Sequence, residues 1–61
     1  MTDLETLTML MEKGGLNIRD YIDEGGCTDN EIHVYLGEYR GYGVSFFFDK
    51  ESGELVRCEG D

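Results

Sequence analysis

Cysteine is scarce in this chain of 61 residues, which contains only Cys27 and Cys58. Small secreted domains that fold around disulfides usually carry more cysteines, so this pair is too few for such a framework. The composition therefore predicts a reduced, cytoplasmic protein. A single bond between Cys27 and Cys58 is the alternative, although no other feature of the sequence supports it.

A long apolar run is also missing. The segment MTDLETLTML at the start has neither the basic beginning nor the continuous apolar stretch of a signal peptide, and it is too polar to span a membrane. We therefore expect no secretion leader and no membrane contact.

Basic residues are few. Five of them face fourteen acidic residues, giving a formal net charge of -9, and the acids are spread from Asp3 to Asp61. A field of this sign repels nucleic acid and anionic membranes and favours basic partners. The sequence predicts no direct nucleic-acid binding and a protein partner with a basic surface. The simpler alternative is that the charge only keeps a small protein soluble.

Motifs for catalysis, cofactors or metals are absent. The candidate metal ligands lack the spacing of a structural zinc site; they are Cys27, Asp29, His33 and Cys58. Neither Ser45 nor Ser52 stands in a nucleophile motif, and the glycines form no phosphate-binding fingerprint. So short a chain has little room for a pocket that shifts carboxylate pKa values. We expect no enzymatic activity, no catalytic residue, no cofactor and no metal.

What is present begins with a helix. Thr2 and Glu5 have the spacing of a capping box, in which each side chain satisfies one free backbone amide. An apolar stripe follows at intervals of three and four residues, formed by Leu4, Leu7, Leu10 and Met11. Gly14 and Gly15 supply the left-handed stop. The pattern predicts one N-terminal helix.

Residues 16–22 fit two structures. Asn17 as a cap, with Ile18, Tyr21 and Ile22 on one face, indicates a short second helix, which is the interpretation we prefer. The same residues fit a strand with Leu16 and Ile18 turned inward. The glycines and polar residues that follow predict a flexible connection.

Three later segments have the patterns of strands. Residues 31–36 alternate apolar and polar side chains, 42–49 are rich in aromatic and β-branched residues, and 55–59 follow a turn that Asp49 opens. We therefore predict a single α+β domain over residues 1–61, in which a three-stranded antiparallel meander packs its inner face on the helix stripe.

The turn leaves two registers open for the second hairpin. A four-residue loop places Asp49 opposite Glu54, so that Leu55 shares the face of Phe46 and Phe48. A three-residue loop with a bulge at Gly53 turns Leu55 to the other face instead. In the first register Val56 and Cys58 lie with Phe47; in the second they lie with Phe46 and Phe48.

Both registers place Phe47 away from the core, because consecutive strand residues alternate between faces. A chain this short has little material to cover a second face of the sheet. The sequence therefore predicts a homodimer, joined by a sheet face or edge around Phe47 and Val56.

Acidic and aromatic residues mark the predicted partner surface. Its carboxylates are Asp20, Asp23, Glu24, Asp29, Glu31 and Glu38, and Tyr35 and Tyr39 lie near the first β-turn. Tyrosine is over-represented in binding hot spots, and distributed carboxylates can imitate a nucleic-acid backbone inside a basic groove. The alternatives are a solvated acidic face and tyrosines that only cover the edge of the core.

In size, charge and expected layout, the chain is similar to the short proteins that phages and mobile elements use against host machinery. This likeness implies an inhibitor or regulator of a basic, nucleic-acid-handling protein that acts as a nucleic-acid mimic. The competing hypothesis is a structural or assembly module that forms homo-oligomers and inhibits nothing.

Overall fold

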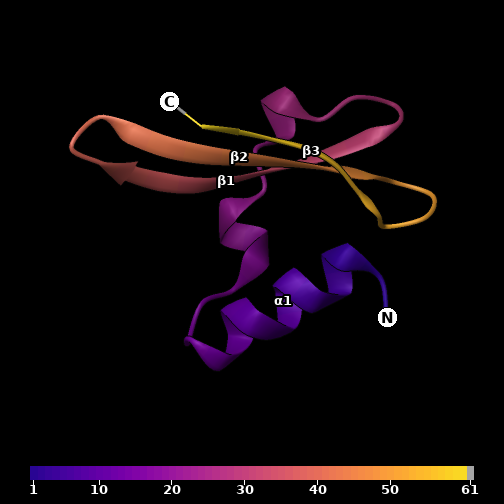
Figure 1. Cartoon of the computed structure of the whole chain (residues 1–61), viewed down its shortest axis with the longest axis horizontal. Helices are drawn as coiled ribbons and strands as arrows, with labels where there is room; N and C mark the ends of the chain where they lie inside the picture. The colour runs from indigo at the N-terminus through magenta and orange to yellow at the C-terminus, as the bar shows by residue number, and fades with distance from the viewer. Residues whose placement is uncertain (61) are drawn as a thin grey trace.

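Helix α1 lies against one face of a small antiparallel sheet (Figure 1). The computed structural model describes residues 1–60, apart from the side chains of Glu38 and Tyr39. The elements are α1 (Asp3–Lys13), the 3-10 turns η1 (Ile18–Tyr21) and η2 (Glu24–Gly26), and the strands β1 (Glu31–Tyr39), β2 (Tyr42–Asp49) and β3 (Leu55–Gly60). The sheet order is β1-β2-β3. The predicted α+β fold with a meander is confirmed.

The capping box at the start of α1 is formed as predicted. Thr2 Oγ1 accepts the Glu5 N–H at 3.1 Å, and the Thr2 N–H donates to Glu5 Oε1 at 3.2 Å. These bonds satisfy amides that have no partner inside the helix. The helix ends before Gly14, and Gly15 has a φ of 80°, the left-handed conformation that glycine adopts readily.

The hairpin between β2 and β3 is hydrogen-bonded to the first turn of α1. The Leu4 N–H donates to Gly53 O at 2.9 Å, and the Leu55 N–H donates to Asp3 Oδ2 at 2.8 Å. Gly53 is buried with a φ of 75°, and a Cβ there would lie 2.8 Å from Thr2 Oγ1. The helix cap and the hairpin are therefore fitted to each other, and this contact sets where α1 crosses the sheet.

The connection from α1 to β1 consists of two short turns. Asn17 Oδ1 accepts the Arg19 N–H at 3.0 Å and starts η1, so the predicted second helix exists as a single 3-10 turn. The strand alternative is reduced to one bridge between Ile22 and Val34. Asp23 then caps η2 by accepting the Gly25 N–H at 3.1 Å. A new cap so close to the first leaves no room for an α-helix.

Neither predicted register of β2 and β3 holds over the whole strand. The Asp49 N–H donates to Glu54 O at 2.9 Å, which is the four-residue loop. Phe48 then lies opposite Leu55 but Phe47 lies opposite Arg57, so Val56 is the extra residue of a bulge. The bulge turns both Leu55 and Cys58 toward the face of α1 and puts Arg57 on the other face, whereas each predicted register placed only one of the two apolar residues there.

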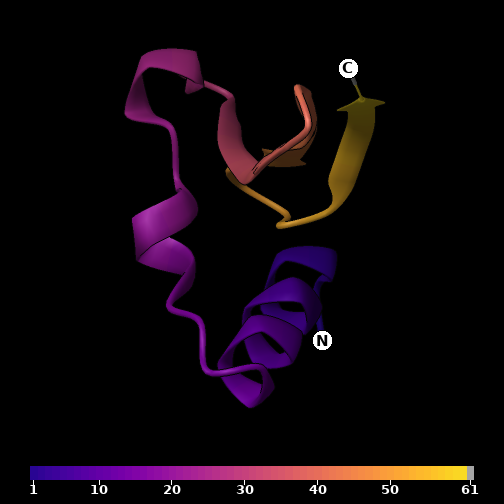
Figure 2. The same ribbon diagram turned by 90° about the vertical axis from the view of Figure 1, so that its left-hand side faces the viewer.

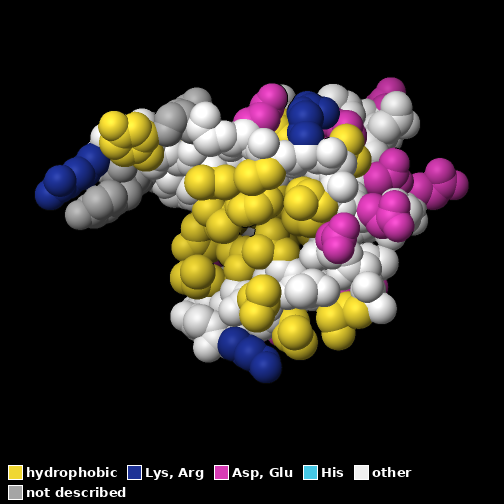
Figure 3. Space-filling model, viewed as in Figure 1, with side chains coloured by type: hydrophobic (Ala, Val, Ile, Leu, Met, Phe, Trp, Pro, Cys, Tyr) yellow, Lys and Arg dark blue, Asp and Glu magenta, His cyan; other side chains and the backbone are white. Residues whose placement is uncertain are grey.

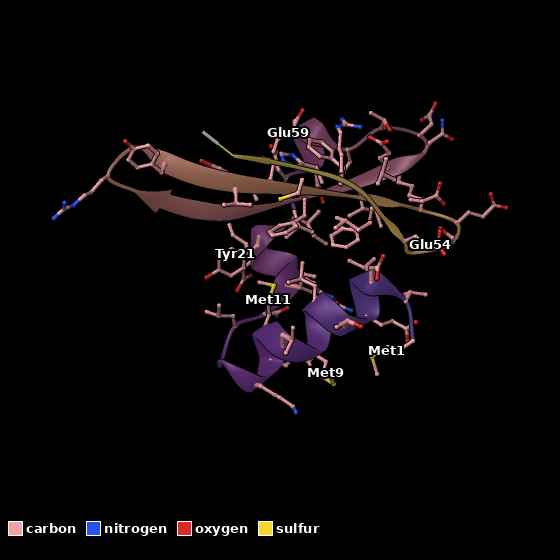
Figure 4. The ribbon with its side chains drawn as sticks, in the orientation of Figure 1. Met1, Met9, Met11, Tyr21, Glu54 and Glu59 are labelled. Atoms are coloured by element: carbon pink, nitrogen blue, oxygen red, sulfur yellow. The ribbon has the colours of Figure 1, made fainter. Side chains whose placement is uncertain are left out.

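The core lies between α1 and the sheet face that carries Phe46 and Phe48. Its most buried side chains are Val34, fully buried, Phe48, 2% exposed, and Met11, 5% exposed. Figure 4 shows Met11 on the side of α1 that faces the sheet. The apolar stripe of the helix therefore packs on this face, as its spacing predicts.

Gly53→Ala should lower stability more than Gly15→Ala. Both glycines have positive φ, which costs a residue with a Cβ about 1 kcal/mol. A Cβ at Gly15 would meet nothing within 4 Å, but one at Gly53 would press against Thr2. We therefore expect Gly53→Ala to lower the free energy of unfolding by about 1 kcal/mol more, measured by urea unfolding. Equal losses would show that the fit between hairpin and helix cap contributes little.

Candidate functional site

The sheet face away from α1 carries a stack of three side chains, one from each strand. His33, Phe47 and Arg57 lie directly opposite one another. The His33 and Phe47 rings are stacked, with centroids 4.5 Å apart and planes within 5°, and the Arg57 guanidinium carbon lies 3.9 Å from the Phe47 centroid. Phe47 is consequently only 9% exposed.

The prediction that Phe47 remains uncovered is wrong. The alternation of strand residues correctly places it on the far face, but long side chains from both neighbouring strands lie against its ring. Val56 differs, because it lies in the bulge and is 50% exposed. The self-association assigned to Phe47 and Val56 stays a prediction, and the exposed apolar surface in that pair belongs to Val56.

The turn over residues 23–27 also covers His33, in addition to the stacked Phe47 ring. Asp23 Oδ2 lies 3.2 Å from His33 Nδ1, and a Cβ on Gly26 would collide with the imidazole. The His33 backbone is also bound: its N–H donates to Cys27 Sγ at 3.3 Å, and its C=O accepts the Asp23 N–H at 2.9 Å. The turn therefore closes the outer edge of β1 and leaves His33 8% exposed.

These residues do not form a nucleophile and base. The Cys27 thiol donates to Asp23 O at 3.3 Å and accepts a backbone amide, so its contacts are with the main chain and not with the imidazole. A catalytic pair needs the thiol and the ring within hydrogen-bond reach. Among the side chains that the structure describes, no group of three or more metal-ligating residues comes together.

The predicted acidic surface divides into bound and free carboxylates. Glu31 accepts two bonds from Arg57 at 3.1 and 3.2 Å, and Asp23 is held by Gly25 and His33. Asp20, Glu24 and Asp29 are exposed on the connection that runs beside β1 (Figure 2). Asp23 and Glu31 therefore support the fold, and the other three remain available to a partner.

The predicted tyrosines and the last acid lie elsewhere. Tyr35 is half-buried on the far face, 6.3 Å from the His33 ring, and it crosses the backbone of Gly43 so closely that a Cβ there would collide with it. It covers its own sheet instead of standing free. The side chains of Glu38 and Tyr39 lie outside the described part of the structure.

A second group of carboxylates surrounds the β2–β3 turn and was not predicted as a site. Asp29, Asn30, Asp49, Lys50 and Glu51 line a shallow depression of about 360 Å³. The Lys50 N–H donates to Asn30 O at 2.9 Å and joins its two sides. Figure 3 shows acidic side chains gathered at this end of the molecule. Asp29 lies beside this turn because β1 and β2 pair Glu31 with Asp49.

Two exposed carboxylates have lowered pKa values. The backbone N–H groups of Ser52 and Glu51 donate to Asp49 Oδ1 at 2.9 and 2.8 Å and lower the pKa of Asp49. Hydrogen bonds from the backbone and the hydroxyl of Thr2 lower the pKa of Glu5 in the same way. Both groups therefore favour the charged form in the folded chain.

An open apolar groove lies on the sheet face that carries α1, between the helix and the sheet. Its volume is about 220 Å³, and it is lined by Asp3, Thr6, Leu7, Leu10, Phe46, Phe48 and Leu55. Leu10 is 57% and Leu55 43% exposed. Figure 3 shows this hydrophobic patch in the centre of the view. The stripe of α1 is thus only partly covered.

Comparisons with protein-family models, curated proteins and solved structures find no match for this chain. Within residues 1–60, none of the helices has the length and apolar character needed to cross a membrane.

Phe47→Ala should unfold or strongly destabilise the chain. Truncating a buried phenylalanine costs about 3 kcal/mol or more, and here it also removes the surface on which His33 and Arg57 stack. Tyr42→Ala is the control, since Tyr42 is 66% exposed and its loss should cost about 0.5 kcal/mol. Urea unfolding measures both. A Phe47→Ala variant as stable as Tyr42→Ala would show that the ring is not packed in solution.

Stability should fall in acid partly because of Asp49. Since its folded pKa is lowered, its contribution is complete above the unfolded pKa of about 4 and is lost as the pH falls through the folded pKa. Asp49→Asn keeps an oxygen acceptor but cannot titrate, so its unfolding free energy should decline less between neutral and strongly acid pH. Glu12→Gln removes an exposed carboxylate on α1 and is the control. Identical acid profiles for Asp49→Asn and the unmodified chain would contradict this role.

Proposed function

We propose that the chain is a small acidic protein-interaction module whose partner is a protein with a basic surface. The proposal depends on carboxylates that are exposed and are not neutralised internally. Between the side chains that the structure describes, Glu31 and Glu59 form ion pairs with Arg57, and Asp23 is the one other carboxylate within 4 Å of a basic side chain, that of His33. The remaining described acids contribute to a strong negative field around a molecule of net charge -9.

The acidic depression at the β2–β3 turn is the best-defined part of this surface. Asp29, Asp49 and Glu51 surround it, and Lys50 is the one cation among the residues that line it. The backbone bonds of Asp49 and the bond between Lys50 and Asn30 hold the two sides in place. A lysine or arginine side chain of a partner would meet there the Asp49 carboxylate, which is already held in place, at a small cost in ordering.

The exposed acids also extend along one side of the molecule. From Asp20 and Glu24 they follow the connection beside β1 to Asp29, where the depression begins (Figure 2). Separate negative charges along a rigid surface can occupy a basic groove that otherwise holds a nucleic-acid backbone. The partner in this proposal is accordingly a nucleic-acid-handling protein, which the chain inhibits or regulates without bond chemistry.

Binding of a fluorescent oligolysine peptide tests the acidic surface. Glu51→Lys should weaken binding about fivefold at low salt, because it places a cation in the depression, and the difference should shrink as salt screens the charges. Glu12→Lys makes the same change in net charge on α1 and is the matched control. Equal losses in the two variants would mean that net charge alone, and no particular surface, attracts the peptide.

The class of partner is tested by elution. Proteins are first captured from a lysate on the immobilised chain. Duplex DNA should then release them, whereas a sodium chloride solution of the same ionic strength as the DNA solution should leave them bound. The Glu51→Lys chain should capture less of the same proteins than Glu12→Lys. Capture that duplex DNA does not reverse would exclude the nucleic-acid groove as the binding site.

A further inference from the structure

Strand β3 is an open edge of the sheet, and all its residues are exposed. It contains no proline, and the features in it that can protect an edge are the charged side chains of Arg57 and Glu59 and the bulge at Val56, which lies before the segment around Cys58. On the other edge, the first part of β1 is covered by the turn over residues 23–27, which is bonded to His33, and by Thr28, whose N–H donates to Glu31 O. In the described part of the chain, nothing is hydrogen-bonded to the outer edge of β3 beyond Leu55.

The hydrogen bonds of His33 determine which groups of β3 point outward. The His33 N–H and C=O are both bonded on the side away from β2, so His33 and Phe47 form a pair without mutual backbone bonds. Phe47 therefore directs its backbone groups to β3, where Arg57 lies opposite. These directions alternate along a strand, so the N–H and C=O of Cys58 point away from β2, toward the open edge of the sheet.

We propose that a second copy of this chain pairs with β3 in antiparallel fashion about a two-fold axis at Cys58. Cys58 then exchanges two backbone hydrogen bonds with Cys58 of the partner subunit. Arg57 lies opposite Glu59 of the partner subunit, and symmetry repeats that pair. The interface joins the two meanders into one continuous sheet.

Charge selects this register over its neighbours. Two residues that face each other in an antiparallel pair both direct their backbone groups toward the other strand or both direct them away from it, so the two-fold axis can pass through a residue position but not between two positions. An axis at Arg57 places two arginines opposite each other, and an axis at Glu59 places two glutamates opposite each other. Like charges in these positions are destabilising, whereas opposite charges contribute about 0.2 to 1 kcal/mol per pair.

Apolar surface beside β3 favours the same occupant. The groove between α1 and the sheet reaches Leu55, and Leu10, Leu55 and Val56 are all about half exposed. Pairing at β3 places the two grooves on the same face of the joined sheet, one on either side of the axis and next to the interface. The acidic depression at the β2–β3 turn is lined by residues outside β3, so this proposal is independent of the proposed function.

Disulfide trapping tests the register. Opposite residues that exchange backbone bonds have Cα atoms about 5.5 Å apart, within the range of a disulfide. Oxidised glutathione can accept the two electrons and two protons that a pair of Cys58 thiols loses, becoming two glutathione thiols. In a Cys27→Ser background, we expect a covalent dimer on non-reducing gels, formed at least about tenfold faster than after unfolding in urea.

A moved cysteine is the matched control. A chain carrying Cys27→Ser, Cys58→Ser and Gly60→Cys has one exposed thiol two positions from the original one and keeps both Arg57 and Glu59. In the proposed register this thiol faces Val56 of the partner subunit, so it should form the covalent dimer at least about tenfold more slowly than Cys58. Equal rates, or a faster rate at position 60, would overturn the register.

Sedimentation of the unmodified chain tests pairing itself. Two molecules of charge -9 repel, so the dimer should strengthen as salt rises, whereas binding to a basic partner should weaken. Glu59→Lys should weaken the dimer at least about fivefold, because it faces Arg57 of the partner subunit, and Glu54→Lys is the control of equal charge. A monomer at high micromolar concentration in high salt would overturn the proposal and leave the proposed function untouched.

Discussion

The stack of His33, Phe47 and Arg57 is the interaction on which the rest of this small structure depends. A sheet has two faces, and residues 1–60 contain one α-helix to cover them. The stack covers the second face with side chains from the sheet itself, and the turn over residues 23–27 extends that cover at His33. Because the far face is closed in this way, α1 is free to pack on the near face alone, and an open apolar groove remains on that face beside β3.

Local signals in the sequence were sufficient for most of the fold. The capping box, the period of the helix stripe and the alternation in the strands depend on residues a few positions apart, and the structure has all of them. The register of β3 was not predicted because it depends on a bulge at Val56. The bulge turns both Leu55 and Cys58 toward α1, whereas either regular hairpin turns only one of them there. The cover of Phe47 was missed for a related reason: it comes from His33 and Arg57, which lie far from each other along the chain.

The acidic surface was only partly accessible to sequence reasoning. Composition gives the sign of the field, but it cannot separate a free carboxylate from one that supports the fold. Glu31 is bound by Arg57, 26 positions away, and Asp23 is used to cap a turn. Conversely, Asp29 and Asp49 become neighbours only because β1 and β2 pair. The group of carboxylates at the β2–β3 turn therefore forms only once the sheet is assembled.

The bulge at Val56 also divides β3 into two parts of opposite phase. Before it, odd-numbered positions face the helix; after it, even-numbered positions do. Loss or gain of a single residue there would invert every downstream side chain, exchanging Cys58 with its charged neighbours. Length at this one point is therefore as strong a constraint on the chain as the identity of any core residue.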